Sequence, residues 1–86
     1  MNRSDVLSRA EDLITGDRNQ SYGDTKESFR RIAAMWSAYL NWTVTPADAA
    51  AMMALLKISR ISTDPTNDDH WIDLAGYAAL GSEVSE

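Results

Sequence analysis

Residues 45–61 read TPADAAAMMALLKISRI, a run in which helix start signals are followed by an uninterrupted apolar stretch. Thr45 can cap a helix, Pro46 suits its first turn, and Asp48 lies where a capping-box carboxylate reaches back to the cap. Residues 49–56 include no polar side chain. A surface helix shows one apolar stripe, whereas this one is apolar on nearly every side. We therefore expect it to be the central helix of an all-α domain.

Three further helices are expected around this one, because apolar residues recur at helical spacing after a capping residue in each case. They are predicted over residues 4–15, 25–41 and 69–81, the first of them capped by Ser4. The second should bury Phe29, Ile32, Ala33, Trp36, Tyr39 and Leu40, with Met35 and Trp42 widening the stripe. Its short turn into the central helix predicts antiparallel packing of those two helices. The sequence thus predicts one all-α domain over residues 1–86, a four-helix bundle.

The size of the chain bounds what this domain can do alone. Eighty-six residues make one domain near the lower end of what buries an adequate core, so we expect the core to be completed by oligomerisation. There is no cysteine, and therefore neither a disulfide frame nor a thiolate metal site. No signal-peptide core occurs in residues 1–20, and the apolar run of the central helix is too short to span a bilayer. A cytoplasmic location, with no membrane partner, is the expectation.

The charge of the chain is unevenly distributed. A net charge of −5 argues against non-specific nucleic-acid binding, which needs a basic surface. Six of the eight basic residues lie in the first 31 positions. No lysine or arginine follows Arg60, and the charged residues after it are aspartates and glutamates. Such a chain could pair its own two ends or pair them between subunits. The alternative is two oppositely charged faces that are merely solvated.

Acidic side chains near the start of the last predicted helix form a candidate metal site. Asp69, His70 and Asp73 can line one helix face, where carboxylates could hold Mg²⁺ through oxygens and waters. His70 could also act in proton transfer. Glu27 on the second helix could be a further oxygen ligand, or simply a capping residue that pairs with Arg30. The alternative for the acidic turn is that the helix dipole favours it and that Asp73 pairs with a cation of the central helix.

Basic and aromatic side chains offer a candidate phosphate site. Lys57 and Arg60 lie three residues apart on the central helix and must either emerge at a cleft or meet acids. A phosphate-binding cleft and an ion-pair seam to the last helix are both open. In the polar loop over residues 16–24, Arg18 could bind phosphate and Tyr22 could stack on a ring, unless Arg18 is solvated and Tyr22 packs on the bundle end. Arg30 is a further candidate cation for such a ligand.

Two stretches of the chain resemble a family of short uncharacterised phage and prophage proteins. One is GDRNQSYGD (16–24), leading into FRRIA (29–33) and Trp36; the other is MMALLKISR (52–60), followed by Asp69, Trp71 and DLAGY (73–77). Together they cover nearly the whole chain. The resemblance implies a phage-type protein in the cytoplasm of a bacterial host.

More distantly, the helix order is similar to that of MazG-type all-α nucleotide pyrophosphohydrolases, which hydrolyse nucleoside triphosphates with Mg²⁺ held by two acidic pairs. This resemblance implies a MazG-like bundle, a Mg²⁺ cofactor and a nucleotide ligand. The second acidic pair would be matched by His70 with Asp73, or by Asp69 with Asp73. The first would fall at Glu27 and Arg30, where a cation replaces one carboxylate.

Three functions are therefore compatible with the sequence. The first is a Mg²⁺-dependent nucleoside triphosphate pyrophosphohydrolase. The second is a non-catalytic protein that binds a nucleotide or signalling nucleotide, since cations outnumber plausible metal ligands. The third is a structural helical interaction protein whose polar residues are seams between subunits. No nucleophile–base–acid set is visible, and nucleotide handling is the function that the sequence favours.

Overall fold

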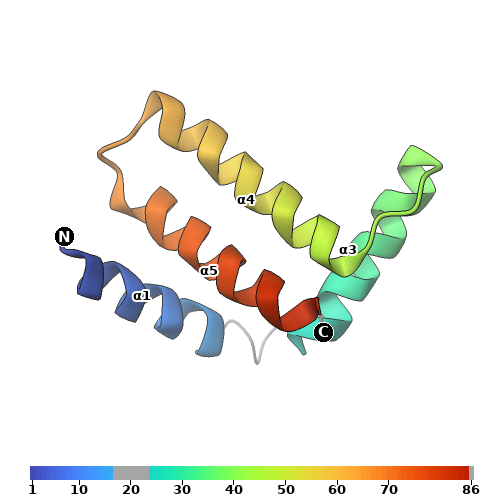
Figure 1. The fold of residues 1–86 in the computed structure, drawn as a ribbon, viewed down its shortest axis with the longest axis horizontal. Helices are drawn as coiled ribbons and strands as arrows, with labels where there is room; N and C mark the ends of the chain where they lie inside the picture. Colours follow the sequence, from blue (N-terminus) through green and yellow to red (C-terminus); the bar gives the residue numbers. More distant parts are fainter. Residues whose placement is uncertain (17–23, 86) are drawn as a thin grey trace.

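The computed structural model describes residues 1–16 and 24–85, and these residues form four helices and no strand (Figure 1). The helices are α1 (Arg3–Thr15), α3 (Thr25–Leu40), α4 (Pro46–Thr63) and α5 (Asp68–Val84). The prediction of an all-α fold with four helices is confirmed. Within the same two ranges, no helix has both the length and the apolar character needed to cross a membrane.

Local capping explains where two of the helices begin. In α4 the predicted capping box is present: the Thr45 hydroxyl accepts from the Asp48 amide at 3.0 Å, and the Asp48 carboxylate accepts from the Thr45 amide at 3.0 Å. In α1 the predicted Ser4 cap is wrong. Asn2 caps this helix, because its side-chain oxygen accepts from the Asp5 amide at 2.8 Å. The first helix therefore starts one residue earlier than predicted.

The helix that the other three share is α5, and not α4 as predicted. Figure 1 shows α4, α5 and α1 side by side with α5 in the middle, and α5 contacts α1, α3 and α4. Two glycines allow this close packing. A Cβ added at Gly76 would lie 3.2 Å from Cγ2 of Ile14 on α1, and one added at Gly81 would lie 3.2 Å from Cβ of Ala50 on α4. Small residues on α5 thus let helices approach it from both sides.

The largest buried cluster lies where α3 meets the first turns of α4 and the second half of α5. It consists of Phe29, Ala33, Val44, Ala49 and Ala50, with Ile32, Trp36, Tyr77, Leu80 and Val84 packed against it. In Figure 1, α3 lies at a steep angle to α4 instead of along it, unlike the predicted antiparallel neighbours. The connection fixes this geometry. Asn41 ends α3 at a φ of 52°, and the Ser37 hydroxyl accepts from the Val44 amide at 2.8 Å.

Candidate functional site

The polar contact between α4 and α5 is an ion pair of two predicted ligand residues. Nζ of Lys57 lies 2.9 Å from Oδ2 of Asp73, and the side chains are only 15% and 27% exposed. Asp73 follows Ile72, which is buried. A carboxylate in such apolar surroundings needs a partner, and Lys57 supplies it. The sequence left a phosphate-binding cleft and an ion pair with the last helix open for Lys57, and in the structure Lys57 forms the ion pair.

His70 lies one turn before Asp73 but is oriented to the connection between α4 and α5. Its Nε2 is 3.4 Å from Oδ2 of Asp64, and the Asn67 side-chain amide donates to the same carboxylate oxygen at 3.1 Å. Its Nδ1 is buried and has no hydrogen-bond partner among the described residues. In the two described ranges, no three histidine, aspartate or glutamate side chains are grouped so that they could hold a metal ion. Mg²⁺ binding by Asp69, His70 and Asp73 stays a prediction.

The other predicted site residues are not brought together with this cluster. Glu27 and Arg30 are exposed on the first turns of α3, which packs against the second half of α5, whereas His70 and Asp73 lie in its first half. Arg60 is exposed on α4, and no ion pair joins it or Arg30 to another described residue. Arg18 and Tyr22 lie outside the described residues. The structure therefore assembles no phosphate clamp from the residues it describes.

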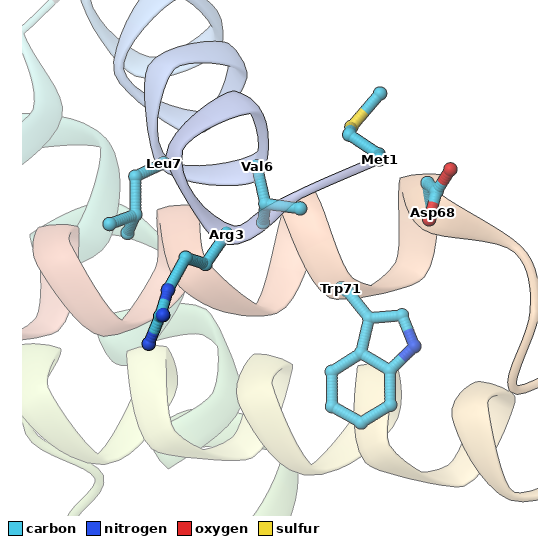
Figure 2. A pocket seen from close by; sticks show the side chains of 6 residues that line it. All are labelled: Met1, Arg3, Val6, Leu7, Asp68 and Trp71. Atoms are coloured by element: carbon cyan, nitrogen blue, oxygen red, sulfur yellow. The ribbon is translucent and has the colours of Figure 1, made fainter.

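A shallow pocket of about 470 Å³, which the sequence did not predict, lies between the start of α1 and the start of α5 (Figure 2). It is lined by Met1, Arg3, Val6, Leu7, Asp68 and Trp71. Trp71 is 43% exposed, and its indole N–H donates to the Pro65 carbonyl at 2.9 Å. Figure 2 shows the Arg3 and Trp71 side chains extending in the same direction from neighbouring helices. Because the pocket has one basic and one acidic side chain in an otherwise apolar lining, it lacks the several cations that would bind a polyphosphate.

Most of the exposed large apolar side chains of the described residues lie on α3, α4 and the turn between them. Eight of the eleven exposed large apolar residues of the described chain lie there. We name this set the hairpin surface; it consists of Met35, Tyr39, Leu40, Trp42, Met52, Leu55, Leu56 and Ile58. Tyr39 is 89% exposed and Trp42 is 77% exposed, so their predicted burial is wrong. The buried cluster includes only the earlier part of the predicted stripe, with Phe29 and Ala33 buried and Ile32 and Trp36 packed against them.

Together, these features define an all-α chain whose described residues bury few large side chains and expose eight large apolar ones on α3, α4 and their turn. The chain belongs to the family described as "Domain of unknown function (DUF6378)", which matches residues 5–85. It is 46% identical over 76 residues to the Gene 55 protein of Mycobacterium phage L5, and 37% identical over 81 residues to the Gene 55 protein of Mycobacterium phage D29. These alignments cover 87% and 94% of this chain.

The same alignments cover 49% and 54% of the two phage proteins, so the chain spans about half the length of the curated relatives it matches. No solved structure matches the chain. The predicted resemblance to a small phage protein family is confirmed. Neither the family description nor the two named relatives mention a nucleotide or an enzyme, and the similarity to MazG-type enzymes stays a prediction.

Proposed function

We propose that this chain is a non-catalytic helical interaction protein of phage type, which binds a protein surface through its hairpin surface. The observation that carries the proposal is the gathering of eight exposed large apolar residues on α3, α4 and their turn. Exposed large apolar residues are normally scattered singly, so eight of them on two consecutive helices and the turn between them favour an interaction site. This is the third of the functions that the sequence left open.

The composition of the hairpin surface suits a protein partner. Its aromatic members, Tyr39 and Trp42, belong to the residue types that dominate binding energy at protein interfaces. Its methionines, Met35 and Met52, are also enriched at interfaces because their side chains adapt to the partner's shape. A nucleotide would instead need cations and hydrogen-bond donors converging on one cleft.

Nucleotide handling has weaker support from the geometry. The ammonium of Lys57 is already paired with Asp73 at 2.9 Å, so a phosphate would have to compete with that carboxylate for it. Arg30 and Arg60 are exposed on different helices, and no group of three acidic or histidine side chains within residues 1–16 and 24–85 could hold Mg²⁺. Hydrolysis with two metal ions requires several carboxylates around them.

Site-specific photo-crosslinking in bacterial cells that produce the chain tests the proposal. A photoreactive residue at Trp42 or Leu55 should give crosslinks to protein, with the partner identified by mass spectrometry. The same residue at Glu11, which is exposed on α1, should give none. Purified protein should show no change in Tm with nucleoside triphosphates or cyclic nucleotides, with or without Mg²⁺. A rise of several degrees that requires Mg²⁺, together with no crosslink at the hairpin surface, would contradict the proposal and favour nucleotide handling.

A further inference from the structure

We infer that the partner of the hairpin surface includes a second copy of this chain, whose α4 packs antiparallel on α4 around a two-fold axis near Leu55. The inference rests on the proposed function and names its partner. It concerns the side of α4 turned away from α5, which we name the α4 outer face. This face consists of Ala51, Met52, Leu55, Leu56, Ile58 and Ser59, all exposed.

The α4 outer face is a continuous helical stripe without charge. Its members recur three and four residues apart around Leu55, so they lie over successive turns of one side. Met52, Leu55, Leu56 and Ile58 are 40%, 63%, 42% and 49% exposed. Of the charged side chains nearest to this face on the same helix, Lys57 pairs with Asp73 of α5, whereas Asp48 and Arg60 are exposed beyond its two ends. Two such stripes can meet without burying an unpaired charge.

The stripe is complementary to itself under a two-fold axis. When two antiparallel copies of α4 meet at Leu55, Met52 of each lies level with Ile58 of the other, and Ala51 lies level with Ser59. Large side chains then share one layer and small ones the next, which is the requirement for an interface built from the same surface twice. The two Asp48 carboxylates would be separated by about 21 Å along the helices. A parallel pair would instead place these like charges side by side.

The accessible surface area of the chain is larger than expected for a monomer of its mass, which supports a partner that covers part of it. The chain exposes 6103 Å². A folded monomer of 9.5 kDa is expected to expose about 5,000 Å². The excess of about 1,000 Å² is close to the roughly 800 Å² that each partner buries in a stable interface. A homodimer through α4 would remove part of that excess.

The experiment combines sedimentation of the purified chain with single-cysteine crosslinking, which is clean because the chain has no cysteine. The native chain should sediment with about twice the 9.5 kDa mass of the monomer. Leu55→Glu should weaken association at least tenfold, because two carboxylates would meet on the axis. Leu7→Glu is the matched control, since Leu7 is 64% exposed against 63% for Leu55 but lies on α1. It should leave the dimer intact, and circular dichroism should show both variants folded.

The disulfide pattern distinguishes the antiparallel arrangement from any other. Leu55→Cys should form a homodisulfide on oxidation, and Leu7→Cys should not. A mixture of Met52→Cys and Ile58→Cys chains should form the mixed disulfide in preference to either homodisulfide, since only the mixed pair is level. Predominant homodisulfides in that mixture, or a dimer that Leu55→Glu leaves intact, would overturn the inference.

The outcome also separates this inference from the proposed function. A chain that is monomeric at all concentrations, yet crosslinks from Leu55 to a different identified protein, overturns the second copy and leaves the interaction function standing. A chain that is monomeric and forms no crosslink from Leu55 overturns both.

Discussion

α4 and α5 are the two most apolar helices of the chain, but they have different neighbours. α5 contacts α1, α3 and α4, and it buries Ile72 and Gly76 in its middle. Among the helices of the described residues, α4 contacts α3 and α5, and the residues it buries, Ala49 and Ala50, belong to its first two turns. The apolar character of α5 is thus explained within the chain. The exposed apolar residues of α4 from Met52 onward have no such cover among the described residues, and the partner proposed above would supply it.

The comparison is sharpest between two aliphatic side chains, one on each helix. Ile72 on α5 is 5% exposed, and Ile72→Ala should lower the free energy of unfolding by about 2–5 kcal/mol through lost burial and a cavity. Leu55 on α4 is 63% exposed, and Leu55→Ala should change it by less than about 0.5 kcal/mol. Urea unfolding, followed by circular dichroism at a concentration where the chain is monomeric, measures both. Equal losses would mean that α4 is covered within the monomer.

The ion pair that joins the two helices gives the next largest expected effect. Lys57→Met leaves the Asp73 carboxylate without its partner and should cost about 1–3 kcal/mol, less than for a fully buried pair because both side chains keep some exposure. The double variant Lys57→Met with Asp73→Leu should recover most of that loss, as an apolar contact replaces the pair. Chemical unfolding is the measurement.

Arg60→Met is the matched control for Lys57→Met, because Arg60 is exposed and has no ion pair with a described residue. It should be nearly neutral. The structural assignment of Lys57 fails if Lys57→Met leaves stability unchanged and instead abolishes a Tm increase caused by a nucleotide. That result would return Lys57 to the phosphate-binding role that the sequence also allowed.

The sequence predicted elements better than neighbours, and α3 shows why. Its cap at Asp24 and the grouping of Phe29, Ala33 and Tyr39 on one stripe follow from local signals. Whether a stripe is covered depends on how far the packed helix extends along it. α4 covers Phe29 and Ala33 but leaves Tyr39 89% exposed. The helical period of a sequence does not tell how far a neighbouring helix extends along the apolar stripe.

The same limit applies to the central helix and to the candidate site. Residues 49–56 are uniformly apolar, which is compatible with a central helix and equally with one that is half covered by its own chain and half by a partner. α5 took the central place because Gly76 and Gly81 admit close neighbours, a property of side-chain size more than of hydropathy. For Asp73, the sequence correctly required a partner but left a cation and a metal both open.

Substitutions at the caps of α4 and α5 should give the smallest change in the free energy of unfolding. They test whether the difference between the two helices arises at their first turns or along their sides. Thr45 caps α4 through the Asp48 amide at 3.0 Å, and Asn67 caps α5 through the Asp69 amide at 3.1 Å. Thr45→Ala and Asn67→Ala should each cost about 1 kcal/mol, because each leaves one amide of a first turn unpaired. Urea unfolding is again the measurement, with Thr45→Ser and Asn67→Ser as controls that keep an acceptor oxygen at each cap and add no charge beside Asp64.

Similar costs for the two alanine variants would show that α4 and α5 start equally well and differ only in what packs along their sides. A much larger loss for Thr45→Ala would mean that α4 depends on its own capping box more than on lateral contacts. In that case the stability of α4 would depend less on a partner that covers its exposed apolar residues than the proposed dimer requires. Capping acts within the first turn of a helix, and Leu55 lies well inside α4. Neither alanine variant should therefore change the disulfide pattern of Leu55→Cys.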